Sequence, residues 1–201
     1  ALAEFDDELF EDLSSEDRYD IELAGQYFAR RFRQGGRSWL DSMLSKHSNG
    51  TVAQRARLLL AARDLPKDWE AAEAEGAEVT EFYWKHFVPY GLGSDLDNVE
   101  FVANQLMKYG RNAIAIDLLG MYLRRDADGE VKTAQLIANA LDGLLGSIED
   151  PELPRLSAYD FEQSFALLER HRDLLGADRI ARLEWAFLSA LGFKPQVPAL
   201  H

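Results

Sequence analysis

Hydrophobic residues recur along the chain every three or four positions, and no run alternates polar and apolar residues between turn signals. The first such segment opens at Ser14 or Ser15. Its apolar face would carry Ile21, Ala24, Tyr27, Phe28 and Phe32. Leucine (30) and alanine (26) outnumber valine, isoleucine and threonine (16 together), which favours helices because straight-chain residues lose little rotamer freedom there. The pattern therefore predicts an all-α fold.

Start and stop signals divide the chain into about ten helices. Asp97 with Glu100, and Ser157 with Asp160, have the spacing of capping boxes, while Gly35-Gly36 is a break. The predicted helices cover about residues 14–35, 39–48, 51–64, 67–75, 77–88, 97–109, 112–125, 129–145, 157–175 and 178–192. The helix after Asn112 has Asp117 as its only charge up to Leu123, so we expect neighbours on several of its sides.

Short connections predict antiparallel neighbours, arranged as stacked, solenoid-like helical hairpins or, alternatively, as a closed helical bundle. Residues 110–115 and 176–181 match at an offset of 66, twice the 33-residue spacing near that of tetratricopeptide-like helix pairs. This match favours the stacked arrangement. We expect an acidic lead-in or linker over residues 1–13 and a single helical domain over 14–201, with two lobes meeting near 89–96 as a variant.

The net charge of −13 is concentrated at one end, since residues 1–22 contain ten acids and one base. The remaining residues carry a net charge of only −4. The overall charge disfavours nucleic acid and anionic membranes as partners. The sequence has no cysteine, no signal peptide and no apolar stretch long enough for a membrane span, so we expect a cytoplasmic protein.

The sequence contains no recognisable catalytic, cofactor or metal motif. Its four histidines (His47, His86, His171 and His201) lack the spacing of metal ligands, and no phosphate-binding or dinucleotide-binding loop occurs. We therefore expect no cofactor and no metal. Asp117 and Glu184 lie in apolar helices and are the alternative basis for an unrecognised enzyme.

Arg30, Arg31, Arg33 and Arg37 form the one basic cluster. The acidic segment before it suggests that these arginines pair within the chain. Residues 4–22 also suggest an alternative function, an acidic helical regulator or effector that binds a basic protein surface.

The aromatic stretch Glu81–Phe87 is followed by further residues that carry a resemblance. They are Val99-Glu100, Leu106, Gly110-Arg111, Leu118-Leu119 and, later, Leu183-Glu184-Trp185. Over roughly residues 65–201 the chain resembles the helical-repeat regions, tetratricopeptide-like or HEAT-like α-solenoids, of large and mostly uncharacterised bacterial multidomain proteins. The resemblance implies an α-solenoid segment with no chemistry of its own and no functional residue to carry over. Because the sequence starts at Ala1 rather than Met and stops at His201, where another helix could begin, we expect a fragment of a larger intracellular protein.

The leading hypothesis is a non-catalytic interaction or scaffold module that binds a protein or peptide. Aromatic residues and arginine are the usual anchors of protein interfaces. The predicted partner-binding residues are Tyr83, Trp84, Arg111, Tyr122 and Trp185. The sequence does not indicate an oligomeric state.

Overall fold

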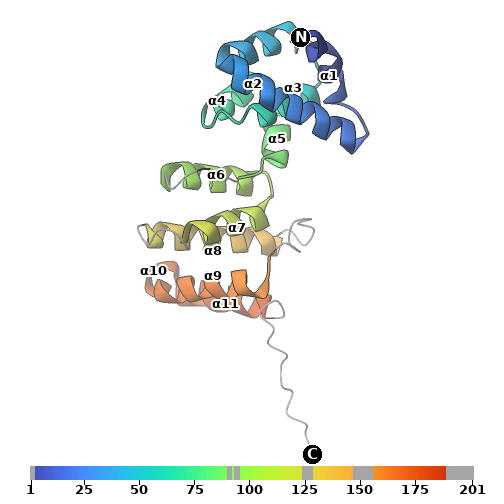
Figure 1. Cartoon of the computed structure of the whole chain (residues 1–201). Helices are drawn as coiled ribbons and strands as arrows, with labels where there is room; N and C mark the ends of the chain where they lie inside the picture. The colour runs from blue at the N-terminus through green and yellow to red at the C-terminus, as the bar shows by residue number, and fades with distance from the viewer. Residues whose placement is uncertain (1–2, 90–91, 93–95, 124–128, 147–155, 189–201) are drawn as a thin grey trace, which may run out of the picture. The chain divides into compact units, whose positions relative to one another are not determined.

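The computed structural model describes residues 3–89, 92, 96–123, 129–146 and 156–188 (Figure 1). These residues form eleven α-helices and one short 3-10 helix, with no strand among them. The all-α prediction is therefore confirmed, whereas the choice between stacked hairpins and a closed bundle stays a prediction. The chain divides into two compact units, residues 1–88 and 89–201.

Unit 1 begins with the 3-10 helix η1 and contains five α-helices. They are η1 (Ala3–Phe5), α1 (Asp6–Asp12), α2 (Arg18–Lys46), α3 (Val52–Ala62), α4 (Lys67–Ala74) and α5 (Ala77–His86). Helix α2 is kinked at Gly36, whose φ of 61° and ψ of −158° are not helical. A positive φ costs glycine little, so the predicted break at Gly35-Gly36 is present as a kink inside one long helix.

Helix α3 is central in unit 1, because it contacts α1, α2, α4 and α5. It starts with a capping box in which Thr51 and Gln54 satisfy each other's backbone N–H groups. Its inner residues Leu58 and Leu59 are fully buried. Helix α3 is thus the one neighbour that the other four α-helices described in this unit share.

Helix α1 is attached to α2 through a buried carboxylate. Asp6 accepts hydrogen bonds from Tyr27 Oη at 2.6 Å and from Arg31 Nε and Nη2 at 2.8 Å each. The Asp6 and Arg31 side chains are only 10% and 15% exposed. This two-point geometry is the strong form of an arginine–carboxylate pair. The predicted pairing within the chain is confirmed for Arg31, and Arg37 likewise binds Asp41 at 2.8 Å.

Apolar contacts complete the attachment of α1. Phe10 and Leu13 are buried, and the Phe10 ring stacks on His47 with centroids 4.0 Å apart. Arg57 Nη1 donates to the carbonyl of Leu13 at 2.5 Å. The sequence predicted a lead-in or linker over residues 1–13, but from Asp6 to Leu13 this segment is a packed part of unit 1. The acidic composition suggested a solvated segment, because the counter-ion of Asp6, Arg31, lies 25 residues further along the chain.

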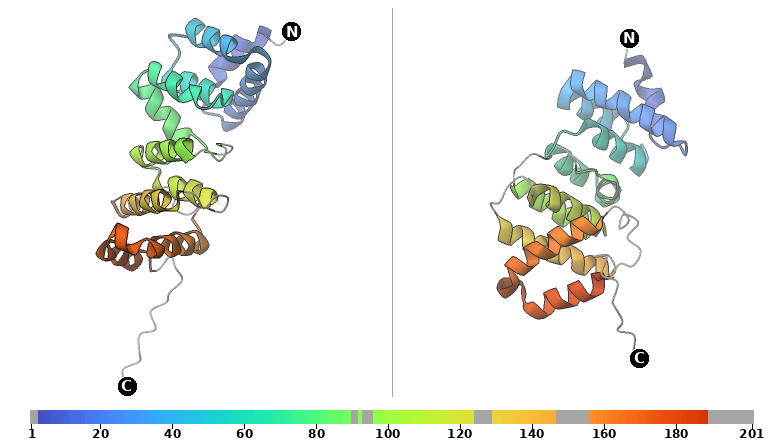
Figure 2. Two further views of the ribbon diagram at one scale, coloured as in Figure 1. Left: turned by 90° about the vertical axis from the view of Figure 1, so that its left-hand side faces the viewer. Right: turned by 60° about the horizontal axis from the view of Figure 1, so that its bottom comes forward.

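The described residues of unit 2 form six helices. Figure 2 draws them in the colours from green to red. They are α6 (Leu96–Lys108), α7 (Asn112–Leu123), α8 (Glu130–Gly146), α9 (Ala158–Arg170), α10 (Arg172–Leu175) and α11 (Ala177–Phe187). As expected from its composition, α7 has neighbours on several sides, because it contacts α6, α8 and α9. Helices α7 and α8 approach closely where Gly143 lies against the Asn112 side chain. A larger residue at Gly143 would clash with the buried side chain of Asn112.

Helix α11 packs on α8 and α9. Ile180 and Leu183 are its buried residues, and both Arg179 and Arg182 bind Asp142 of α8, at 2.6 and 2.5 Å. The predicted capping box of Ser157 and Asp160 is present at the start of α9. The predicted cap at Asp178 is wrong by two residues, since the N-cap of α11 is Gly176, which has a φ of 90°.

Replacing Asp6 with asparagine should destabilise unit 1 by about 3 kcal/mol, because Arg31 would lose its charged partner in a largely buried site. Burial acts to raise the pKa of Asp6, but hydrogen bonds from Arg31 and Tyr27 outweigh it and lower the pKa below 3.8. The difference from wild type should therefore persist down to pH 4 and disappear in stronger acid. Urea denaturation followed by circular dichroism measures both effects.

The matched control is Asp7→Asn. Asp7 is 63% exposed and binds Lys46 at the surface, so its loss should have little effect on the denaturation midpoint. Equal midpoints for the two variants would contradict the central role assigned to Asp6.

Candidate functional site

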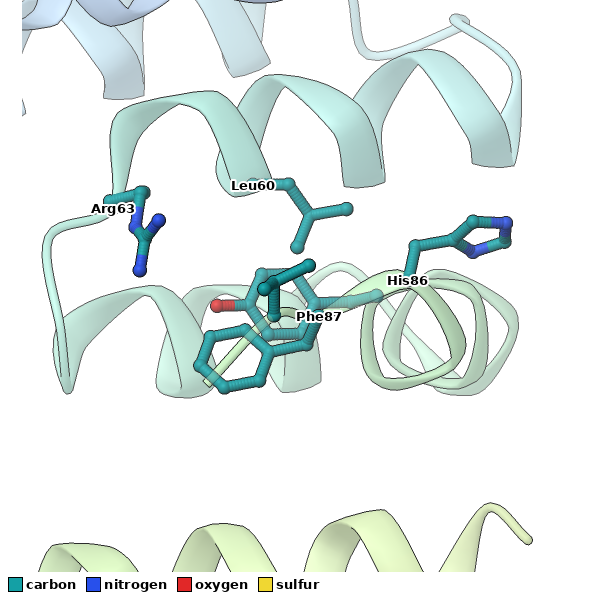
Figure 3. A pocket seen from close by; sticks show the side chains of 6 residues that line it. Leu60, Arg63, His86 and Phe87 are labelled. Carbon is teal, nitrogen blue, oxygen red and sulfur yellow. The ribbon is translucent and has the colours of Figure 1, made fainter. Parts of the chain in front are cut away.

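A pocket of about 130 Å³ opens in unit 1 where α3 and α5 end. Its lining residues are Leu60, Arg63, Tyr83, His86, Phe87 and Val88. In Figure 3 Arg63 and His86 lie on opposite sides of Leu60 and Phe87. The pocket thus combines apolar walls with a polar group at each side.

Backbone geometry at the end of α3 positions Arg63. This residue has a left-handed φ of 54°, which is uncommon outside glycine, asparagine and aspartate, and it caps the helix by donating its N–H to Leu59 at 3.3 Å. The chain turns there, and the exposed Arg63 side chain lies at the pocket.

His86 is held in one orientation by its own helix. Its ring stacks on Phe82 with centroids 4.0 Å apart, and its Nδ1 lies 2.8 Å from the Phe82 carbonyl oxygen. Because a carbonyl only accepts, Nδ1 must carry a hydrogen and donate it. The other ring nitrogen, Nε2, is therefore the one left for contacts outside the helix.

The charge of a buried carboxylate acts on Tyr83, one of the residues that line this pocket. Asp68 is fully buried, accepts the N–H of Asp64 at 2.6 Å, and lies 3.6 Å from Arg37 Nη1. Burial raises the pKa of Asp68 to about 6, outweighing the Asp64 hydrogen bond and the charge of Arg37. Burial and the nearby Asp68 charge also raise the pKa of Tyr83, while Arg63 acts to lower it. The electrostatics of Arg63, Tyr83 and Asp68 are therefore coupled.

The structure does not bring the five predicted partner-binding residues together. Tyr83 and Trp84 are each 1% exposed and belong to an aromatic cluster with Trp69 and Phe87 in unit 1. In unit 2, Tyr122 is buried on α7 and Arg111 is half-buried just before that helix. We therefore correct the predicted surface: Tyr83, Trp84 and Tyr122 are core residues, because their rings fill spaces between helices.

Trp185 is the exception. It is 78% exposed on α11, the largest exposure among the large apolar side chains of the described residues. Ala177 and Ala181, eight and four residues earlier, are exposed as well and share its face by helical spacing. Leu174 of the adjoining α10 is 71% exposed. We call the surface of Ala177, Ala181 and Trp185 the outer face of α11.

The two carboxylates that suggested an enzyme are both half-buried, Asp117 on α7 and Glu184 on α11. In the described part of the chain, no group of three or more histidines and carboxylates is placed to hold a metal ion. Within the same residues, every helix is too short or too polar to cross a bilayer.

Sequence reasoning missed Arg63 and Asp68. The sequence offers no direct signal for Asp68, because its neighbours Lys67 and Glu70 make α4 look like a solvated acidic helix. Arg63 stands before the predicted stop at Leu65-Pro66, which marks a helix end without showing which way the side chain turns.

No family model matches this chain, and the comparisons with curated proteins and with solved structures find no match either.

Asp68→Asn should stabilise the protein at pH 8, by up to about 3 kcal/mol, the equivalent of two pKa units. The pKa of Asp68 is raised in the folded state, so folding favours its protonated form. The unfolding free energy of the wild type should rise as the pH falls from about 7 to about 4, and its deficit relative to the variant should shrink. Urea denaturation at several pH values measures this trend.

Asp41→Asn serves as the control, since Asp41 also binds Arg37 but is 57% exposed. Its stability relative to wild type should change little over the same pH range. A constant difference between wild type and Asp68→Asn from pH 8 to pH 4 would contradict the assignment of the titration to Asp68.

Proposed function

We propose that the chain is a non-catalytic helical interaction or scaffold module that binds a protein or peptide through the outer face of α11. The observation that carries this proposal is the 78% exposure of Trp185 on a helix whose other side packs against α8 and α9. Tryptophan is enriched among the residues that dominate binding energy at protein interfaces. An indole left in water gains apolar burial only when a second molecule covers it.

The neighbours of Trp185 suit the approach of another helix. Ala177 and Ala181 are small, so a second backbone can come close to α11 on this side and pack against the indole. Asp178 and Arg182 are exposed at its edges and supply a polar rim. The proposed occupant is therefore the apolar face of an amphipathic helix in a protein partner.

The opposite side of α11 shows the same kind of packing within the chain. Ile180 and Leu183 are buried against α8 and α9, and the pairs from Arg179 and Arg182 to Asp142 hold the helix in place. Helix α11 is thus fixed before a partner arrives, which lowers the ordering cost of binding.

The other functions are less well supported. Asp6, the buried acid of residues 4–22, has its partner in Arg31, so the acidic-regulator hypothesis rests on the exposed acids that remain. The enzyme hypothesis rests on Asp117 and Glu184, which are half-buried on two different helices, α7 and α11. We also propose that the chain is a helical-repeat region of a larger intracellular bacterial protein.

Trp185→Ala should abolish or strongly reduce partner binding while leaving the fold intact. The side chain contributes little to the core, so the thermal midpoint should stay near that of wild type. Partners retained by immobilised wild-type protein would be identified, purified, and titrated against both proteins by calorimetry. We expect Kd to rise at least tenfold for the variant.

Val131→Ala is the matched control, because Val131 is also exposed, at 48%, and lies on α8. It should bind the purified partner as the wild type does. Unchanged affinity of Trp185→Ala, or an equal loss with Val131→Ala, would refute the outer face of α11 as the binding surface.

A further inference from the structure

The pocket between the ends of α3 and α5 has a size that limits its occupant. Its volume of about 130 Å³ is close to the ~150 Å³ of an apolar cavity that takes up benzene. Nucleotides and drug-sized molecules occupy pockets of roughly 300 Å³ or more. The space therefore suits one aromatic ring or one branched aliphatic group.

The walls of the pocket are chemically divided. Leu60, Tyr83 and Phe87 form an apolar region, in which the Tyr83 and Phe87 rings stack with centroids 5.5 Å apart. Both rings are nearly fully buried, at 1% and 3% exposure, so these walls are fixed by the core of unit 1. A ligand group entering here would meet a preformed surface.

The polar side of the pocket carries positive charge in a chain whose net charge is −13. Arg63 presents a guanidinium, whose fork of N–H donors matches the two oxygens of a carboxylate. The C-terminal end of α3 places a partial negative charge nearby, but a helix end carries roughly half a charge against the full charge of the guanidinium. The two neighbouring carboxylates have cations of their own, since Asp64 lies 3.6 Å from Lys67 and Asp68 lies 3.6 Å from Arg37. His86 adds a second polar group on the other side of the apolar region.

The geometry points to a binding site for a small apolar carboxylate, with its ring or branched chain against Leu60, Tyr83 and Phe87 and its carboxylate on Arg63. A free aromatic or aliphatic acid and a peptide chain that ends in an apolar residue share this chemistry. The site lies in unit 1 and is independent of the function proposed for α11, so either proposal can fail alone.

Titration of the full chain with benzoate tests the site, with benzamide as the neutral ligand of the same shape. Calorimetry should give a Kd at least tenfold lower for benzoate, and NMR should show the largest shifts at the Arg63 side chain and the His86 ring. Titration with acetyl-glycyl-phenylalanine, as the free acid and as the amide, distinguishes a peptide C-terminus from a free small acid as the natural ligand. Tighter binding of the peptide acid than of benzoate indicates a chain terminus, and the reverse order indicates a free acid.

Arg63→Asn removes the guanidinium while keeping a residue that accepts the left-handed backbone, and it should weaken benzoate binding at least tenfold. Arg63→Lys retains the charge but loses the two-point fork, so its affinity for benzoate should lie between those of wild type and Arg63→Asn. Leu60→Phe fills the apolar region and should also block binding, with circular dichroism confirming its fold. Equal affinity for benzoate and benzamide, unchanged binding by Arg63→Asn, or shifts confined to other parts of the chain would overturn the site.

Discussion

The hydrogen-bonded ion pair of Asp6 and Arg31 is the interaction on which the arrangement of unit 1 depends. Taking a carboxylate and a guanidinium largely out of water is costly, and the two hydrogen bonds between Asp6 and Arg31, with a third from Tyr27, offset that cost. The geometry fixes the register of α1 on α2, in which Phe10 and Leu13 are buried in the core. Apolar burial then stabilises a helix of seven residues that would be too short to persist alone.

Local signals explain why so much of the helix pattern follows from the sequence. The capping box at Ser157 and the break at Gly35-Gly36 depend on backbone groups a few residues away, so their effects can be read directly. The role of α1 could not be read in this way. Its partners on α2 and α3 lie 21 to 44 residues away, and nothing in a local pattern identifies which arginine faces which acid.

Candidate site residues were harder to predict than helices, because one residue type serves both core and surface. Trp84 and Trp185 both lie on helices among charged neighbours, yet one is 1% and the other 78% exposed. The difference lies in packing: α5 contacts α3 and α4 around Trp84, whereas Trp185 lies opposite the buried side of α11. Similarly, the burial of Asp68 and the turn at Arg63 arise from contacts between helices.

The distribution of the four tryptophans has a spectroscopic consequence. Trp39, Trp69 and Trp84 all belong to unit 1, and the last two are buried, whereas Trp185 is the single tryptophan of unit 2 and faces solvent. Indole fluorescence shifts to longer wavelength in water. The intrinsic emission of the protein therefore contains a blue component that follows the core of unit 1 and a red component that reports on α11, so the two units can be observed separately without a label.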